Sequence, residues 1–490
     1  MSNRREFLQR ALIGGAGISI AGLIRPALTG RDFALVSGSK PSEDDAWSGA
    51  ARILQRIKAP SFAKREFDIR KFGAVGNARA DCTEAFARAI SACSRAGGGR
   101  VIVPEGEFLT GAIHLQSNVN LHVTKDATIR FDRDPKRYLP VVFTRWEGME
   151  LMNYSAFIYA FGQQNIAITG EGIIDGQADC DHWWPWKGRT GCGWKKGDPE
   201  QSKARKLLYE MVEKGTPVNQ RVFGEGSYLR PNFIQPYRCN NVLIEGVTLR
   251  HSPMWQLHPV LCTNVTIRQV RIEREAGATE QTGPNADGCD PESCRDVLIK
   301  DCTFATGDDC IAIKAGRNND GRRVAVPSEN IVIQGCRMKD GHGGITIGSE
   351  ISAGVRNVFA EDCHLDSANL NIAIRVKNNA LRGGQLENFY FRNIEVGQVS
   401  DAAVTVDFNY EEGENGPFTP QMRHLVIENL RSGRSKRAID LQGLKNAHLD
   451  DIQLSNCTFE NVASSSVVRY VDGLSLNNVR VNGSILTGIS

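Results

Sequence analysis

Four apolar positions recur through the second half of this 490-residue chain, at offsets 0, 2, 5 and 7 within each unit. The alternation is that of two very short strands with one buried face, joined at a corner of Gly, Asn or Asp. One unit cannot bury its own apolar face, but stacked units can. The pattern therefore predicts an all-β fold, a right-handed parallel β-helix. The units begin at Val242, Val265, Val297, Ile331, Val358, Phe389, Leu425, Ile452 and Leu474.

An antiparallel sandwich is the alternative, because it too is built from short strands. Sandwiches rarely repeat one four-position template nine times, and these units start 22 to 36 residues apart. We expect one solenoid domain over residues 66–490, with an insertion at about 178–232. Thr83–Ala96 has helical spacing and is predicted to cap the open end of the solenoid. The three glycines after it lead into a strand, so they form a turn rather than a phosphate-binding loop.

The N-terminus has the features of an export signal. Arg4 and Arg5 precede an apolar, glycine-rich stretch, residues 12–24, that is too short to span a bilayer comfortably. We expect residues 1–30 to be a Tat-type signal, which predicts a periplasmic or secreted protein with no membrane association after signal removal. Residues 31–65 are expected to be a linker or N-terminal extension that contains a short helix over 47–57.

Composition and cysteine spacing exclude some partners. A net charge of +3 is close to balance and argues against nucleic acid as the main partner. None of the thirteen cysteines has zinc-site spacing, and we expect no metal and no cofactor. Cys180 and Cys192 lie in the insertion and are the better disulfide candidates. Four others recur at one position of the repeat and are expected to be small buried core residues: Cys302, Cys336, Cys363 and Cys457.

Polar clusters stand at equivalent ends of consecutive units. In a parallel β-helix, equivalent points of adjacent coils stack about 4.8 Å apart. We therefore expect one stripe of carboxylates beside a cationic patch. Gathering like charges costs stability, so the stripe is a candidate functional site. In chain order the clusters are Asn285-Ala286-Asp287-Gly288, Gly307-Asp308-Asp309-Cys310, Gly341-His342-Gly343-Gly344 and Arg375-Val376-Lys377.

The ordered motifs Asn-x-Asp, Gly-Asp-Asp, Gly-His-Gly and Arg-x-Lys resemble those of glycoside hydrolase family 28, the polygalacturonase family. The likeness runs from about Phe67 to the C-terminus and includes the segment 72–76, Phe-Gly-Ala-Val-Gly. Two positions depart from the family pattern, Ala286 where Thr is common and Val376 where Ile is. Neither side chain is expected to perform chemistry. The resemblance implies a hydrolase of α-1,4 bonds between galacturonic acid residues in pectin, an acidic cell-wall polysaccharide.

The resemblance also implies catalytic roles. An inverting hydrolase uses one carboxylic acid to protonate the leaving oxygen and another carboxylate to activate water, with the two groups usually about 6.5–9.5 Å apart. By similarity Asp308 is the general acid, and Asp287 and Asp309 hold and activate the water. The residues alone do not choose between Asp308 and Asp309 as the acid. His342 is expected to help set protonation, and a buried structural histidine is the alternative.

Substrate binding is expected from the remaining polar residues of the stripe. Arg375 and Lys377 alternate onto one face of an extended segment and could bind a galacturonate carboxylate, although a solvated pair is the alternative. Asn285 is expected to orient substrate or the Asp287 turn, and Tyr410 matches a tyrosine that the family often has. Four of the seven tryptophans lie in the insertion, where they either pack it or stack on sugar rings: Trp183, Trp184, Trp186 and Trp194.

The long insertion could close one end of a cleft, which favours exo action as in exo-acting relatives. Two other functions stay open. A pectate lyase would share the fold but act by β-elimination, with calcium held by the acidic residues. A non-catalytic pectin-binding solenoid would keep its binding without the acid. The sequence carries no expectation for the oligomeric state.

Overall fold

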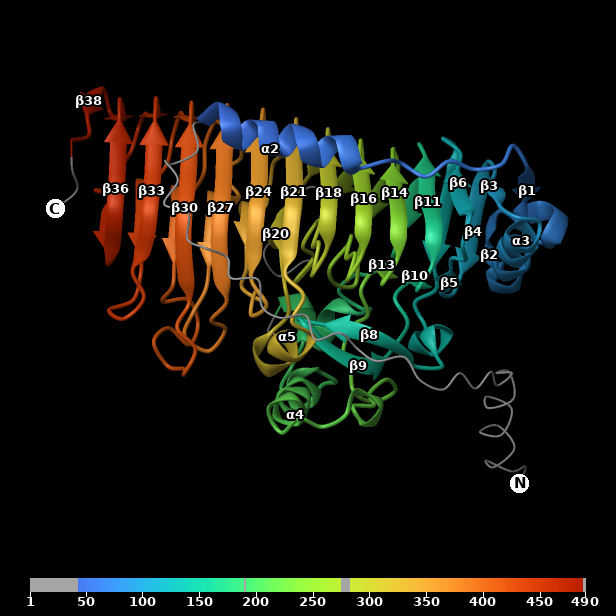
Figure 1. Ribbon diagram of the computed structural model, residues 1–490. Helices are drawn as coiled ribbons and strands as arrows, with labels where there is room; N and C mark the ends of the chain where they lie inside the picture. Colours follow the sequence, from blue (N-terminus) through green and yellow to red (C-terminus); the bar gives the residue numbers. More distant parts are fainter. Residues whose placement is uncertain (1–42, 189–190, 275–282, 488–490) are drawn as a thin grey trace, which may run out of the picture. The chain divides into compact units, whose positions relative to one another are not determined.

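The computed structural model describes residues 43–188, 191–274 and 283–487. The predicted export signal lies outside these residues. Among the described residues, no helix has the length and apolar character needed to cross a membrane. The chain winds through successive coils whose strands pair in parallel with those of the next coil (Figure 1). The predicted all-β parallel β-helix is confirmed.

Two long sheets run the length of the solenoid. Sheet A has 13 strands: β1 (Glu66–Asp68), β3 (Gly99–Val103), β6 (Val119–Val123), β11 (Gln164–Gly170), β14 (Asn240–Glu245), β16 (Thr263–Arg268), β18 (Arg295–Lys300), β21 (Ser328–Gln334), β24 (Val355–Glu361), β27 (Gln385–Arg392), β30 (Gln421–Glu428), β33 (Leu449–Ser455) and β36 (Val471–Asn477). Sheet B has 14 strands: β2 (Asn77–Asp81), β4 (Gly106–Thr110), β7 (Ala127–Phe131), β12 (Ile173–Asp175), β15 (Thr248–Arg250), β17 (Arg271–Glu273), β19 (Thr303–Phe304), β22 (Arg337–Met338), β25 (His364–Leu365), β28 (Glu395–Val396), β31 (Arg431–Ser432), β34 (Thr458–Phe459), β37 (Arg480–Val481) and β38 (Ser484–Ile485).

A third sheet, sheet C, completes each coil, although the sequence pattern predicts only two strands per unit. Its strands lie outside the four-position template, and some hold polar and glycine residues, as in the Gly-His-Gly-Gly of β23, so the template that reveals sheets A and B does not reveal them. Isolated bridges at Leu257 and Cys289 connect its two parts. The first part is β5 (Ile113–His114), β10 (Ile158–Phe161) and β13 (Ile234–Tyr237); the second is β20 (Ile311–Ile313), β23 (Gly341–Ile347), β26 (Leu370–Lys377), β29 (Ala402–Asp407), β32 (Arg437–Gln442) and β35 (Val467–Arg469).

Equivalent positions of the four-position template pair with one another in adjacent coils, and their side chains form the core. Val242 pairs with Val265, Val265 with Val297, and Val297 with Ile331, and all of these side chains are buried. The four cysteines at the third template position are also buried free thiols, as predicted. Buried apolar side chains from successive coils therefore stack into one continuous core along the solenoid.

Helices close and cover the solenoid. α3 (Thr83–Arg95) buries its apolar face in the core at the N-terminal end, which confirms the predicted cap. α2 (Glu43–Arg56) includes most of the short helix predicted at 47–57 and packs across sheet A through Ala50 and Ile53, which contact a cluster with Phe359 (Figure 1). Part of the expected extension is thus a helix packed on the outer surface of sheet A.

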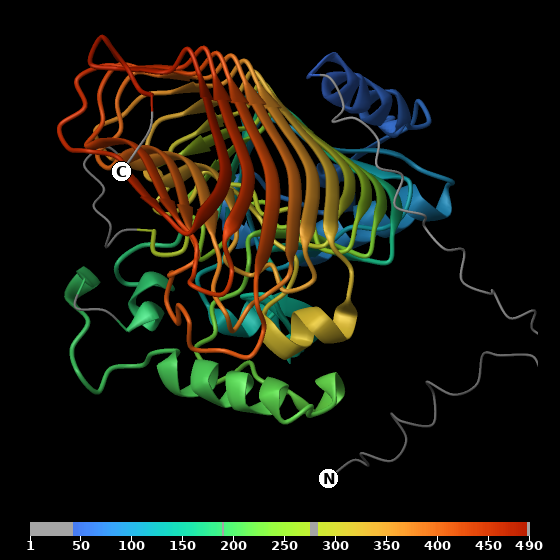
Figure 2. The same cartoon turned by 60° about the vertical axis from the view of Figure 1, so that its left-hand side comes forward.

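The insertion forms a separate layer on the side away from α2 (Figures 1 and 2). It contains α4 (Ser202–Glu213), whose Leu208 packs against Trp146 and Leu151 of a hairpin that the sequence pattern did not predict. The predicted disulfide joins Cys180 to Cys192. The short helices of the insertion are η3 (Trp184–Lys187), η4 (Gly191–Gly193) and η5 (Val218–Gln220). The hairpin is β8 (Val142–Trp146) and β9 (Met149–Asn153), and the other short helices of the chain are η1 (Ile69–Phe72), η2 (Pro135–Tyr138) and α5 (Asn318–Val324).

Two insertion tryptophans are packing residues. Trp183 is 2% exposed and Trp184 is 8% exposed, and both belong to the solenoid's core cluster. The Trp184 indole N–H donates to the Ser252 carbonyl at 2.9 Å, which ties the insertion to the coil below it. Trp186 is half-buried and packs against the same core. The packing role therefore holds for Trp183 and Trp184.

Candidate active site

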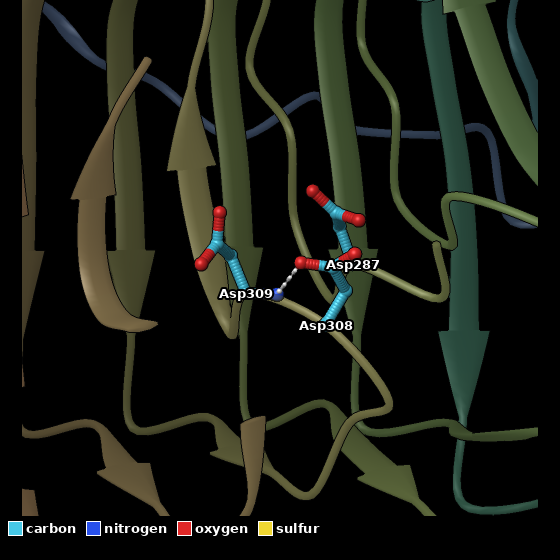
Figure 3. Close-up of side chains that lie close together, drawn as sticks. All are labelled: Asp287, Asp308 and Asp309. Atoms are coloured by element: carbon cyan, nitrogen blue, oxygen red, sulfur yellow. Dashed lines mark hydrogen bonds between the residues drawn. The ribbon is translucent and has the colours of Figure 1, made fainter. Parts of the chain in front are cut away.

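Neighbouring coils bring the three predicted aspartates together (Figure 3). Asp287 lies in the segment that precedes the Cys289 bridge, and Asp308 and Asp309 lie between β19 and β20. The two segments are joined by backbone hydrogen bonds, including one from the Gly288 N–H to the Asp309 carbonyl at 2.9 Å. As a result, one carboxylate oxygen of each aspartate lies within 4.8 Å of the others.

The three carboxylates differ in their access to solvent. The Asp308 side chain is 18% exposed, whereas the side chains of Asp287 and Asp309 are 4% and 0% exposed. Asp308 is therefore the aspartate of the three that can touch a large ligand. Its Oδ1 accepts a hydrogen bond from the Asp309 N–H at 3.0 Å, which fixes the orientation of the carboxylate.

His342, at the start of β23, lies one coil beyond Asp308. Its Nδ1 is 3.0 Å from Asp308 Oδ1, and its side chain is 33% exposed. This hydrogen bond raises the pKa of His342 above its ordinary value. Burial opposes ionisation of Asp308, but the hydrogen bond and charge of His342, with Lys377 and Lys314 nearby, hold the pKa of Asp308 well below its usual range. The partly exposed position of His342 rules out the alternative of a fully buried structural histidine.

Asp309 is held by the cations of β26. Lys377 Nζ donates to Asp309 Oδ2 at 2.6 Å, and Arg375 Nη1 lies 3.6 Å from Asp309 Oδ1. Burial alone would lower the pKa of Lys377, but the charge of Asp309 raises it. The Tyr410 ring centre lies 5.6 Å from the Arg375 guanidinium and 5.4 Å from Lys377 Nζ. The Lys377 side chain is 8% exposed and that of Arg375 18%, so Arg375 is the more accessible cation.

Asp287 has its own cation, which the motif comparison missed. Lys314 Nζ, at the end of β20, lies 3.4 Å from Asp287 Oδ2 and 3.6 Å from Asp290 Oδ1. Burial and the neighbouring Asp308 charge raise the pKa of Asp287 to about 7. Burial, with the Asp287 charge next in weight, likewise raises the pKa of Asp290 well above its usual range. The sequence signal for Lys314 is a lysine that continues the Ile-Ala-Ile strand after Gly-Asp-Asp.

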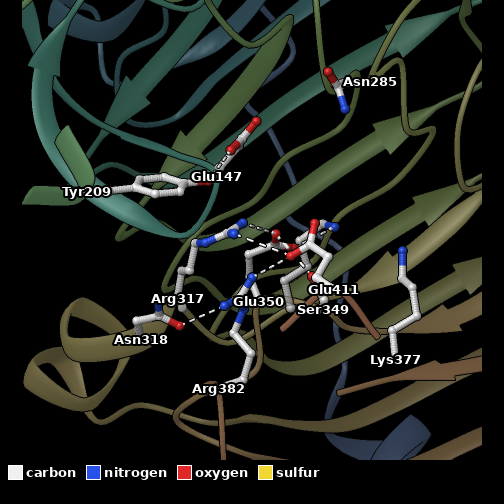
Figure 4. Close-up of polar contacts among 12 residues, drawn as sticks. Glu147, Tyr209, Asn285, Arg317, Asn318, Ser349, Glu350, Lys377, Arg382 and Glu411 are labelled. Atoms are coloured by element: carbon white, nitrogen blue, oxygen red, sulfur yellow. Dashed lines mark hydrogen bonds and ion pairs between the residues drawn. The ribbon is translucent and has the colours of Figure 1, made fainter. Parts of the chain in front are cut away.

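A chain of ion pairs extends this cluster toward α5 and the loop after β29 (Figure 4). Glu350 Oε2 lies 3.2 Å from Lys314 Nζ, and Glu350 Oε1 accepts from Arg317 Nη1 at 3.1 Å. Arg382 Nη2 donates to Glu411 at 2.9 Å, beside Tyr410 in sequence. Burial opposes ionisation of Glu350, but Lys314 and Arg317 hold its pKa well below its usual range.

Asn285 connects the site to the insertion. Its Oδ1 accepts hydrogen bonds from Lys187 Nζ at 2.6 Å and from Arg230 Nη2 at 2.8 Å. Its Nδ2 donates to Asp308 Oδ2 at 3.5 Å, and its backbone has φ 53°, in the left-handed region that Asn tolerates better than most residues. The insertion therefore contacts the residue that precedes the aspartates.

The predicted stripe is thus assembled as one cluster. The aspartates, His342, Arg375 and Lys377 lie in it, with Asn285 and Tyr410 at its sides. Three close carboxylates could offer oxygens to a cation, but lysine and arginine groups already supply positive charge at 2.6–3.6 Å from two of them. Glycoside hydrolases use a pair of carboxyl groups that flank the bond to be cleaved, and this cluster, with Asp308 partly exposed, could supply such a pair.

Comparison with known proteins agrees with this class. The model of glycosyl hydrolases family 28 matches residues 219–479. The chain belongs to this family, and it is a glycoside hydrolase. It is similar to a hyperthermoactive exopolygalacturonase of Thermotoga maritima, with 47% identity, a TM-score of 0.86, and coverage of 90% of this chain and 97% of that one.

Two curated proteins are more distant. A probable polygalacturonase of Vitis vinifera is 27% identical over 450 residues, which cover 86% of this chain and 81% of that protein. An exo-poly-alpha-D-galacturonosidase of Dickeya chrysanthemi is 26% identical over 471 residues, which cover 86% of this chain and 75% of that protein. Similarity therefore extends over most of the chain and is not confined to the site motifs.

Proposed function

We propose that this enzyme hydrolyses α-1,4 bonds between galacturonic acid residues of pectin or polygalacturonate. The observation that carries the proposal is a partly exposed carboxyl, Asp308, hydrogen-bonded to His342 and backed by two buried carboxylates. Arg375 supplies an accessible guanidinium beside them, which suits the carboxylate of a galacturonate unit. The relatives named above as polygalacturonases support the same substrate.

Asp308 acts as the general acid in this proposal. Its hydrogen bond with His342 holds one exchangeable proton, whether that proton sits on the imidazole or on the carboxyl. When a glycosidic oxygen approaches Asp308 and begins to gain charge, the proton passes to it and the bond to the anomeric carbon breaks. His342 then takes up a proton from solvent, since a third of its side chain is exposed.

Asp287 and Asp309 hold and activate the attacking water. Their oxygens lie within 4.8 Å of an Asp308 oxygen, closer than the about 6.5–9.5 Å usual for inverting enzymes and nearer to the spacing of retaining ones. Burial supports inversion instead. At 4% and 0% exposure, both side chains are poorly accessible to a sugar ring, whereas a water molecule is small enough to approach a carboxylate with little exposed surface.

Exo action is supported by the insertion. Its Lys187 and Arg230 bind Asn285, so the insertion lies directly against the site, and the Cys180–Cys192 disulfide restrains part of it. A wall at this position would stop the sugar chain after its first units. The exo-acting names of two similar proteins support this proposal.

Proton NMR of a polygalacturonate digest tests these points together. We expect a first product of inverted anomeric configuration and release of one small product from the outset. An unsaturated product that absorbs in the near ultraviolet would indicate a lyase. Binding without any product would indicate a non-catalytic solenoid, and a first product of retained configuration would exclude the proposed mechanism.

We also propose Tat export, based on Arg4 and Arg5 before the apolar stretch 12–24. The disulfide in the insertion supports a final location in an oxidising compartment such as the periplasm or the extracellular space. Fusion of residues 1–42 to a reporter in a bacterial host tests this. Export should require the Tat machinery and should be lost when both arginines are replaced by lysine.

A further inference from the structure

Lys314 is a buried lysine surrounded by carboxyl groups. Its side chain is 3% exposed, and it leaves sheet C at the end of β20. Nζ lies 3.2 Å from Glu350, 3.4 Å from Asp287 and 3.6 Å from Asp290, and 4.4 Å from the centre of the Trp255 ring. A lysine is costly to bury unless carboxylates compensate its charge, so the protein maintains this cluster against a desolvation penalty.

Asp287 and Asp290 have few polar partners other than Lys314. Asp287 Oδ1 has no hydrogen-bond partner among the described residues, and neither oxygen of Asp290 has one. Lys314 is thus the nearest cation described for Asp287, and Lys377, whose Nζ donates to Asp309, has a smaller effect on it. The ammonium group is shared with Glu350, which competes for it.

We propose that Lys314 is a positioning residue for the reaction: its ammonium group orients Asp287 and stabilises the ionised carboxylate that activates water. This inference rests on the proposed function, in which Asp287 must be ionised. Glu350 opposes the effect, because its negative charge draws the ammonium group and repels that of Asp287. Arg317 in turn holds Glu350 through Oε1.

The charged groups around Asp287 together determine how easily its carboxyl ionises. Asp290 lies on the same segment, Asp308 and Asp309 lie on the next coil, and Lys314 and Lys377 are the cations. Trp255 covers Lys314 and limits water, which strengthens each of these interactions. Loss of Lys314 should therefore make Asp287 harder to ionise, and loss of the Glu350 charge should make it easier.

Two substitutions test the proposal by shifts of opposite sign in the pH profile of kcat/KM on polygalacturonate. Lys314→Met should raise the apparent pKa of the acid-side limb by about one pH unit or more. It should lower kcat near pH 6 about tenfold and change KM little. Glu350→Gln, which keeps the shape of the side chain, should shift the limb downward. Lys314→Arg should restore a limb close to that of the wild type.

Arg221→Met is the matched control, because it also removes a buried cation, one that binds Asp320 away from the aspartates. It should lower Tm and leave the limb unchanged. An unmoved limb in Lys314→Met, or a shift of the same sign in both test variants, would overturn the inference. If Lys314→Met does not fold, Glu350→Gln is a sufficient test: an unchanged acid-side limb of its pH profile would overturn the inference.

A readout without turnover separates this inference from the proposed function. Carboxyl carbon NMR of the wild type, compared with Asp287→Asn to assign the signal, gives the titration midpoint of Asp287. Lys314→Met should raise that midpoint even if the wild type acts on another substrate. A wild type that titrates as expected but does not hydrolyse galacturonan would contradict only the proposed function. An unchanged midpoint would contradict only the role of Lys314.

Discussion

His342 Nδ1 lies 3.0 Å from Asp308 Oδ1, so the imidazole of one coil and the carboxyl of the preceding coil share a hydrogen bond at the surface of the site. The pair carries one more proton below the pKa of His342 than above it. Asp308 can therefore act as an acid although its own pKa is held low, because the proton that leaves the pair is the one that the hydrogen bond holds.

Removing the carboxylic acid should abolish turnover and spare binding. Asp308→Asn keeps the size of the side chain and cannot donate a carboxyl proton, so we expect kcat to fall by about 10²–10⁴. Binding of an oligogalacturonate, measured by calorimetry, should stay within a few-fold of the wild type. Asp362→Asn, an exposed aspartate of the solenoid surface, is the matched control and should keep full activity. Unchanged turnover in Asp308→Asn would remove Asp308 from the mechanism.

The pH dependence should be bell-shaped. Asp287 must be ionised to activate water, and its pKa is raised to about 7, so kcat/KM should fall as the pH drops below that region. The His342–Asp308 pair must keep its proton, so activity should fall again as the pH rises through the raised pKa of His342. In His342→Gln the alkaline limb should move or vanish. A full wild-type alkaline limb in that variant would show that another group sets it.

Asp287→Asn should inactivate the enzyme and stabilise the fold at alkaline pH. A carboxyl whose folded-state pKa lies above the unfolded value is harder to ionise in the folded state, so it destabilises the fold increasingly as pH rises from about 4 to about 7. At pH 8 a shift of about three pKa units corresponds to about 4 kcal/mol, so the substitution should raise the free energy of unfolding by up to about that amount. The gain should shrink toward pH 4, which thermal denaturation at both pH values would measure.

Arg375 and Lys377 should differ although they belong to one motif. Arg375→Ala removes an accessible guanidinium, and we expect KM to rise about tenfold or more with little loss of stability. Lys377→Met leaves the fully buried Asp309 without its 2.6 Å partner, and we expect a loss of about 3–5 kcal/mol in stability. Kinetics and thermal denaturation of both variants make the comparison. Equal losses of Tm would contradict this division of roles.

Helix α2 should stabilise the solenoid without affecting catalysis. Ile53→Asp places a charge in the buried contact with sheet A, and we expect a loss of about 2–4 kcal/mol. Below the unfolding temperature kcat/KM should be unchanged, since α2 and the insertion layer lie on opposite sides of the solenoid. Arg52→Ala, on the exposed face of the same helix, is the control. A large drop in kcat/KM for Ile53→Asp would indicate coupling between sheet A and the site.

Sheets A and B could be predicted because their buried positions repeat. Val297, Ile331 and Val358 occupy one register, and each needs an apolar partner in the next coil. Sheet C could not be predicted in this way, because its strands lie outside the four-position template and carry glycine and polar residues of the site. The β8–β9 hairpin was missed for another reason, since its partner Leu208 lies in α4, far along the chain.

That these polar residues lie together could be predicted from motif order, but the contacts that each of them makes could not. The spacing of Arg375 and Lys377 predicts a shared face without saying that Lys377 Nζ is buried against Asp309. Lys314 also depends on three-dimensional contacts, since Glu350, its closest partner, lies 36 residues further along the chain. A charge network of this kind becomes visible only when the coils are stacked.

The backbone bond from Gly288 to Asp309 shows that each functional cluster is delivered by its own coil. Each coil of the site thus carries its own set of reactive groups and connects to its neighbours through paired apolar positions. Exchange of a single coil between relatives, such as the one that bears His342, could alter how the His342–Asp308 pair delivers its proton while leaving the neighbouring coils in place. Specificity in such an enzyme can change one coil at a time.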